Sequence, residues 1–431
     1  VKRTLDDTSF AVSTSNSVAF DVDTGTSSNE EYENGLMWSK LEQPEHVPTA
    51  NINYIGSKNY PIRRILALRD SLFILKDDGV FRLTGNGGSW NIDPIDVSTK
   101  IIAPDSAVVM NNQIFCLSDQ GIVTISDIGV QVISRPIEDQ ITDLISASYD
   151  NLKKLSFGMA YDTDRKYYLY TIGEGSDTYP SQAFVYNTFT QAWTKHIKNA
   201  KHAFVNRTDD KIYLANPDDK HVLQERKALN FTDYVDEQLD GFSVVSSSGY
   251  DVVLNDVTGL NVGYLLYESS TVYSIITAID VPTKTVTVND LKTWAVASVT
   301  IYKSIPVVIE YAVQDFKNPG VMKHFQECQI LFRNAQFLTG NISFYTDLSG
   351  GYSSTVFEGS YGSDLWGLFV WGTGTWGGLA RPKPIRAFVP REKSRGTLLS
   401  TRLTIDNAYS KWSLNGVSLY YDWVSERTSR T

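Results

Sequence analysis

The chain has few cysteines and histidines, the residues that form disulfides and many metal sites. It contains only two cysteines, Cys116 and Cys328, and five histidines. Both cysteines stand in apolar stretches typical of buried strands, so no disulfide scaffold is expected and assembly in a reducing cytoplasm is favoured. No two histidines have the spacing of a zinc-binding pair on one helix. We therefore expect neither a metal nor a cofactor.

Excess positive charge and long apolar runs are also missing. The formal net charge is -10 at pH 7, which argues against general affinity for nucleic acid, because phosphate binding needs clustered Lys and Arg. No apolar run is long enough to cross a bilayer, so we expect no membrane span. The chain opens on Val1 with no signal peptide visible, and the sequence leaves open where its true start lies.

Catalytic motifs are not apparent either. There is no Gly-x-Ser-x-Gly elbow, and the glycine-rich string Gly85–Trp90 lacks the Lys and the helix of a phosphate cradle. Carboxylate pairs such as Asp162 and Asp164 stand beside predicted strand ends, where Asp commonly forms turns. A glycosidase would need two acids facing each other across a cleft, which the sequence leaves open. We expect turn-forming acids and no enzyme.

What the chain does contain is a recurring hairpin. Aromatic residues make up 12% of the sequence and favour strands. The stretch Asp70–Leu83 alternates apolar and polar residues on both sides of Asp78-Gly79, a pair that supplies the positive φ of a hairpin turn. The pattern returns at Asn112–Ile125, and looser copies begin at Arg165 and Asp210. A period of roughly 40–50 residues with about four strands per unit is typical of a β-propeller.

The predicted fold class is all-β: a β-propeller of about six blades with an inserted small β-barrel domain and irregular loops. Residues 1–231 are predicted to form the first part of the propeller, with one short helix over 136–151. Strands of a different spacing over 232–304 predict the inserted barrel. Residues 305–431 are predicted to return to the propeller and its closing strands, with a Gly- and Trp-rich loop over 347–380. The blades are expected near 36–56, 61–97, 100–135, 154–198 and 202–227.

Two stretches are candidate contact surfaces. The segment 381–402 carries many basic residues and a single acid, which predicts contact with an acidic surface of another subunit or partner; a solvated loop and a phosphate contact are the alternatives. The tryptophans of the Gly/Trp stretch would pack either in their own core or against a neighbouring chain. The candidate interface residues are Trp366, Trp371, Trp376, Arg386, Arg391, Lys393 and Arg395.

Several phrases resemble a known family. Leu36–Pro48, followed by Pro61–Gly85, resembles the tail nozzle proteins of short-tailed bacteriophages, also called tail tubular or DNA-stabilisation proteins. Ala183–Thr194 is similar to the third-blade phrase of that family, and Trp412–Tyr421 resembles its final strands. The likeness covers about half of the chain and rests on the order and combination of these phrases.

The resemblance implies a structural virion protein, assembled in the host cytoplasm, that forms a homo-hexameric tube. The tube would lie below the portal and its tail adaptor ring and would contact tail fibre or tailspike proteins. Double-stranded DNA would wait in it and pass through it during ejection, without sequence-specific binding. An acidic lumen would let DNA slide, and propeller blades would give rigid walls without free sheet edges.

The alternative is a propeller enzyme or lectin that acts on host surface glycans, and a third possibility is a secreted scaffold propeller. The enzyme would need a ring of polar and aromatic residues at one mouth of the propeller and would release sugar from host polysaccharide. A hexamer in solution favours the tube, whereas a monomer that trims polysaccharide favours the enzyme.

Overall fold

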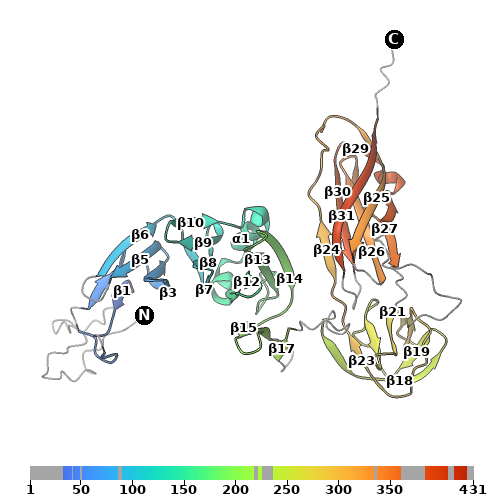
Figure 1. The fold of residues 1–431 in the computed structure, drawn as a ribbon, viewed down its shortest axis with the longest axis horizontal. Coiled ribbons are helices and arrows are strands. Elements are labelled where there is room, and N and C mark those ends of the chain that lie inside the picture. The colour runs from blue at the N-terminus through green and yellow to red at the C-terminus, as the bar shows by residue number, and fades with distance from the viewer. Residues whose placement is uncertain are drawn as a thin grey trace, which may run out of the picture. The chain divides into compact units, whose positions relative to one another are not determined.

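The chain folds into two compact units, Val1–Glu225 and Arg226–Thr431, each described by itself. In both units the regular structure of the described residues is mostly antiparallel strands (Figure 1). The computed structural model describes residues 33–40, 42–48, 51–85, 90–217, 222–225, 236–333, 337–360, 384–405 and 412–424.

Propeller-type blades make up the first unit. Each is an antiparallel meander in which strands consecutive in sequence lie side by side, and β1 (Gly35–Met37) pairs separately with β2 (Ile52–Tyr54). The first two blades contain β3 (Ile62–Leu68), β4 (Ser71–Lys76), β5 (Gly79–Gly85) and β6 (Trp90–Asp96), then β7 (Ile101–Met110), β8 (Gln113–Ser118), β9 (Gly121–Ser126) and β10 (Gly129–Val132). The next two contain β11 (Phe157–Tyr161), β12 (Lys166–Thr171), β13 (Gln182–Asn187) and β14 (Ala192–Ile197), then β15 (His202–Asn206), β16 (Lys211–Ala215) and β17 (Val222–Gln224).

The hairpin recognised in the sequence is the middle of the first two blades. Asp70–Leu83 forms β4 and β5, and Asn112–Ile125 forms β8 and β9. Gly79 and Gly121 open the second strand of each hairpin with φ of +139° and +111°, a conformation that side chains rarely adopt. The turn chemistry that predicted the repeat is therefore the chemistry that forms it.

The first strand of each blade packs against the first strand of the next, so that β3, β7, β11 and β15 form a continuous inner row. Apolar side chains fill the space between successive blades: Phe73 of β4 and Ile114 of β8 share one cluster, and Tyr168 of β12 and Ile212 of β16 share another. Blades joined through inner strands and apolar faces are the propeller arrangement. The predicted fold class is confirmed in this respect.

The helix predicted over 136–151 is present and extends somewhat further. A 3-10 turn, η1 (Arg135–Ile137), leads into α1 (Glu138–Leu155). Ile141 of α1 is buried in the cluster that joins the second and third blades. Among the described residues, no helix has both the length and the apolar character that crossing a membrane requires.

A small closed barrel opens the second unit, as the fold prediction expects of the inserted domain. Its strands are hydrogen-bonded in the order β18-β19-β22-β21-β20-β23, and the pairing register shifts between Val244 and Ser246 of β18. Such a bulge bends a strand and so helps the sheet to close. Fully buried Leu266, Ile276 and Ile301 fill the interior. The strands are β18 (Gln238–Ser248), β19 (Asp251–Leu254), β20 (Leu265–Tyr267), β21 (Tyr273–Asp280), β22 (Thr285–Val288) and β23 (Ser298–Tyr302).

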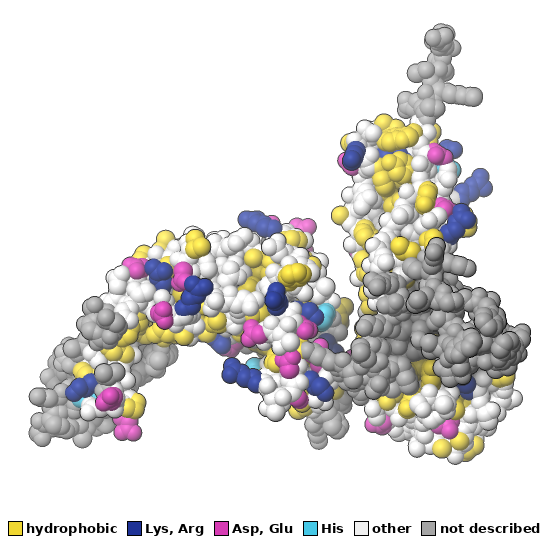
Figure 2. Space-filling view, in the orientation of Figure 1, with side chains coloured by type: hydrophobic (Ala, Val, Ile, Leu, Met, Phe, Trp, Pro, Cys, Tyr) yellow, Lys and Arg dark blue, Asp and Glu magenta, His cyan; other side chains and the backbone are white. Residues whose placement is uncertain are grey.

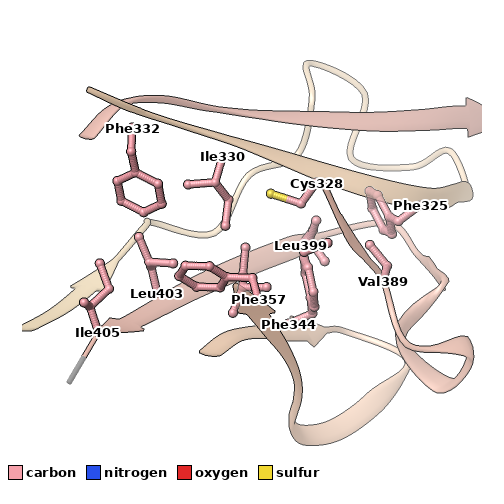
Figure 3. Close-up of a cluster of buried hydrophobic side chains, with 12 residues drawn as sticks. Phe325, Cys328, Ile330, Phe332, Phe344, Phe357, Val389, Leu399, Leu403 and Ile405 are labelled. Atoms are coloured by element: carbon pink, nitrogen blue, oxygen red, sulfur yellow. The ribbon is translucent and has the colours of Figure 1, made fainter. Parts of the chain in front are cut away.

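The strands after the barrel form a sandwich of two sheets. One sheet has the order β24-β30-β26-β27, and in the other β25 pairs with β28, β29 and β31. Phe325 and Phe332 of β25 face Phe344, Phe357 and Leu403 of the opposite sheet across one apolar core (Figure 3). The strands are β24 (Val307–Glu310), β25 (Lys323–Arg333), β26 (Phe337–Thr346), β27 (Ser349–Ser360), β28 (Ile385–Phe388), β29 (Arg395–Gly396), β30 (Leu399–Ile405) and β31 (Ser413–Trp423).

This sandwich differs from the predicted return of residues 305–431 to the propeller. Its strands pair with one another, and β25 pairs along most of its length with β31, far away in sequence. Long strands with one apolar face bury that face best against a second sheet. Among the described residues the blades all lie in the first unit, whereas about six were predicted from the whole chain.

Gly158 sets how closely the inner strands approach each other. An ideal Cβ on Gly158 of β11 would lie 2.1 Å from the carbonyl oxygen of Ser106 in β7. The same carbonyl accepts a hydrogen bond of 3.0 Å from the buried Tyr167 hydroxyl. Because the obstacle is backbone in the middle of a fixed contact, any side chain at residue 158 would push the second and third blades apart.

Gly158→Ala is therefore expected to lower the free energy of unfolding by about 3 kcal/mol, the upper end of overpacking costs. Denaturant unfolding of the full chain measures the change. Gly416→Ala is the matched control, because Gly416 also lies in a strand but an ideal Cβ there would meet no atom within 4 Å. Equal midpoints for the two variants would contradict the close-approach argument.

Candidate functional site

A cavity of about 370 Å³ lies beside the inner strands of the first unit. Every lining residue belongs to the first unit. The strands β3, β7, β11 and β15 all contribute, together with the residues that lead into β11 and β15. The charged and aromatic lining residues are Arg64, Asp105, Lys154, Phe157, Lys201 and His202.

An irregularity in β7 shapes one wall of this inner-strand cavity. The pairing of β7 with β8 shifts register between Ala103 and Val108. Within the shift, the Ser106 hydroxyl donates to the Ala103 carbonyl at 2.6 Å and accepts from the Leu117 amide at 2.8 Å. Ser106 is thus buried, while the side chain of Asp105 is 75% exposed at the cavity. Bulges of this kind commonly redirect a side chain next to a functional site.

The cavity lining carries more positive than negative charge. Arg64 is held in place because its Nη1 donates to Asp105 Oδ1 at 3.0 Å and to the Pro104 carbonyl at 3.1 Å. Lys154 and Lys201 make no side-chain ion pair within the described part of the chain. Three cations therefore share the cavity with one carboxylate, in a protein whose formal net charge is -10.

One side of the cavity is aromatic. The Phe157 ring stacks on Tyr170 at 4.8 Å between centroids and lies 5.0 Å from the His202 ring. Burial raises the pKa of Tyr170, so that its phenol stays neutral at physiological pH. The cavity lining thus combines a fixed guanidinium, two amino groups and two aromatic rings that lie close together.

Six of the seven predicted interface residues fall into three groups. Trp366, Trp371 and Trp376 lie outside the described residues. The Arg386 guanidinium, on β28, forms an ion pair with Glu327 and lies over the Phe388 ring. Exposed Arg391 and Arg395 lie in η3 (Arg391–Lys393) and β29.

Lys393 is a correction to the predicted interface. Its side chain is buried, with 2% of the residue exposed, and its Nζ donates to the carbonyls of Ser349 at 2.8 Å and Gly350 at 2.9 Å. A buried amino group needs such partners, and these bonds fix the turn between β26 and β27. Lys393 therefore stabilises its own chain and offers no surface to another.

Several acids beside strand ends are hydrogen-bonded within turns and loops. Asp210 accepts a bond from the Thr163 hydroxyl, and Asp209 accepts one from the Lys211 amide. Asp177 accepts hydrogen bonds from the Ser181 hydroxyl and two backbone amides. Burial by itself raises the pKa of Asp177, but the three hydrogen bonds together outweigh it, so that the pKa lies below its ordinary value. Within the part of the chain that the structure describes, no three His, Cys, Asp or Glu side chains gather to hold a metal ion.

Sequence reasoning did not find the inner-strand cavity. Arg64, Lys154 and Lys201 stand far apart in the chain and carry no motif, and His202 was considered only as a metal ligand. One signal was available in the sequence. Arg64 and His202 lie in the first strand of a repeat, and Lys201 directly precedes one. The first strands of propeller blades meet around one axis.

Comparisons with known proteins leave the family open. No family model matches the chain, and no curated protein is similar to it in sequence. The extracellular domain of a protein described as a hybrid two-component system from B. thetaiotaomicron is 12% identical, with a TM-score of 0.24, over 70% of this chain and 46% of that one. The sialidase of Trypanosoma rangeli is 9% identical, with a TM-score of 0.25, over 88% of this chain and 75% of that one. Similarities this low carry no argument about function.

Replacing Lys393 tests its assignment to the interior. Lys393→Met is expected to lower the free energy of unfolding by about 2 kcal/mol, because two carbonyls lose their donor. Denaturant unfolding measures the loss. Arg391→Met, an exposed neighbour in the same short helix, is the control and should change stability by less than about 0.5 kcal/mol. A Lys393 variant as stable as this control would contradict the buried role.

The turn acid Asp177 predicts a pH dependence. Its pKa is lowered in the folded state, so its stabilisation is complete above the ordinary value of 3.8 and is lost as the pH falls through the lower folded value. Asp177→Asn should cost about 1 kcal/mol at pH 7, and this cost should shrink below about pH 4. Asp150→Asn, at an exposed helix position, is the control. A cost for Asp177→Asn that stays constant down to about pH 2 would refute the assignment.

Proposed function

We propose that this chain is a structural virion protein that forms the distal tail nozzle of a short-tailed phage. In this role it is not an enzyme: six copies form a tube that retains double-stranded DNA and conducts it during ejection. The observation that carries the proposal is the order of the phrases that resemble the nozzle family. Pro61–Gly85 coincides with the first three strands of a blade, Ala183–Thr194 with β13 and β14, and Trp412–Tyr421 with β31.

The blades supply the stiffness that a pressurised tube needs. Neighbouring blades share apolar clusters. At Gly158 the backbones of the second and third blades are so close that no side chain fits between them. A close-packed interior has low compressibility and transmits load. Such a wall suits a mechanical role.

Surface charge supports passage of DNA without retention. On the face seen in Figure 2, acidic and basic side chains are interspersed over the first unit. Firm phosphate binding needs clustered cations, and the formal net charge of -10 opposes it. DNA would therefore slide through a bore built from this protein.

Exposed apolar side chains on strands of the sandwich support assembly. Among the described residues β24 and β27 end their sheet, and they expose Val308 at 59% and Val356 at 68%. Phe388 of β28 is 63% exposed, and hydrophobic side chains are visible on this part of the surface in Figure 2. Apolar edges of this kind are usually covered in an assembly. The covering partners in the proposal are other copies, the tail adaptor ring and fibre or tailspike proteins.

The second candidate, an enzyme or lectin for host surface glycans, is favoured by the inner-strand cavity, which brings cations and an aromatic face together. The turn acids favour the nozzle, because a carboxyl group with a lowered pKa, such as Asp177, is a poor general acid. Sugar release from host polysaccharide distinguishes this candidate from the nozzle.

The proposal is tested by the native mass of the purified full chain. We expect a hexamer, and we expect Arg391→Glu with Arg395→Glu to weaken hexamer formation about tenfold or more, because charged pairs at an interface lose favourable interactions on reversal. Arg207→Glu, at an exposed turn of the first unit, makes the same kind of charge change outside the basic segment and should leave the mass unchanged.

A wild-type chain that stays monomeric and releases sugar from host polysaccharide would replace the nozzle with the enzyme. A doubly reversed variant that assembles as well as wild type would remove the basic segment from the interface.

A further inference from the structure

We propose that the inner-strand cavity binds a small organic anion, namely a phosphate or carboxylate group carried by a body of about the size of a sugar. The inference concerns the first unit alone and goes beyond the proposed tail function. It rests on the charge, the dimensions and the fixed geometry of the residues that the four inner strands and their flanks contribute.

Charge determines the sign of the ligand. Lys154 lies in the last turn of α1, and Lys201 directly precedes β15. The fold brings both residues to the same cavity as Arg64. Asp105 is the single acid in the lining. An excess of cations in a concave site focuses positive potential and concentrates anions there.

Arg64 is oriented before any ligand arrives. Its contacts with Asp105 and the Pro104 carbonyl both use Nη1. Nε and Nη2 make no contact within the described residues and remain as donors, and a guanidinium held in this way can grip a planar carboxylate or a phosphate through two parallel hydrogen bonds. Pre-organisation of this kind reduces the entropy lost on binding.

The dimensions of the cavity argue against a bare inorganic ion. At about 370 Å³ it lies within the range of pockets for organic ligands, which is roughly 300–1,000 Å³. The Phe157 ring and the neighbouring His202 ring add aromatic groups to the same lining. A ligand with one anionic group and a compact body would use both features, whereas inorganic phosphate would use only the first.

Asp105 provides an internal competitor. Its carboxylate forms an ion pair with the Arg64 guanidinium, and its side chain is 75% exposed. Such an exposed pair contributes little to the stability of the fold. A ligand anion must share the guanidinium with it. Removing this one negative charge should therefore strengthen binding, an effect that a purely structural role for Asp105 does not produce.

The test is isothermal titration calorimetry on the full chain at low salt. The probes are ribose 5-phosphate, galacturonate, inorganic phosphate and uncharged ribose. We expect ribose 5-phosphate or galacturonate to bind in the millimolar range or tighter, at least tenfold more strongly than ribose and more strongly than inorganic phosphate. Which of the two sugar anions binds better identifies a phosphate or a carboxylate as the preferred group.

Variants assign the binding to this cavity. Lys154→Ala and Lys201→Ala should each weaken it about tenfold, and Asp105→Asn should tighten it several-fold. Lys153→Ala removes the same charge one residue away on α1, from a side chain outside the lining, and should have no effect.

Three results would overturn the proposal: no binding of either sugar anion, equal binding of ribose, or equal losses in Lys153→Ala and Lys154→Ala. Unchanged affinity in Asp105→Asn would remove Arg64 from the site and overturn the geometry as argued. Because all of these measurements concern ligand binding, their failure leaves the test of hexamer formation untouched.

Discussion

The contact between β7 and β11 is the constraint on which the first unit depends. Gly158 allows the backbone of β11 to approach the Ser106 carbonyl, and the Tyr167 hydroxyl donates a hydrogen bond to the same carbonyl. Ser106 in turn fixes the irregular part of β7 that carries Asp105 to the cavity. Blade packing and site geometry therefore share one cause, and a change at Gly158 would disturb both.

Buried lysines are the second recurring device. Lys76, Lys323 and Lys393 are each at most 2% exposed, and each amino group donates to backbone carbonyls. The desolvated charge is compensated by these hydrogen bonds. Lys76 and Lys323 bind loop carbonyls, whereas Lys393 binds the first two residues of β27.

Part of this structure could be predicted from the sequence, and part could not. The hairpins were predictable, because Asp78-Gly79 and the alternation around it are local signals and the same local chemistry forms the turn. The sandwich was not, because the pairing of β25 with β31 is distant in sequence and each strand by itself resembles a blade strand. Lys393 was misassigned for a related reason: a basic residue in a basic segment gives no sign that it is buried. The cavity, built from residues of four repeats, needed the inner row of strands before it could be recognised.

The blades of the first unit form one coupled body held through their inner strands, and hydrogen exchange of the full chain, followed by mass spectrometry, tests this most directly. If the blades are coupled, the amides of β4, β8 and β12 should exchange through one shared opening reaction, with the same free energy of opening. This is the pattern of a single cooperative unit. If the blades opened one at a time, with clearly different protection in the second and third, the inner-strand contact at Gly158 would not hold them together.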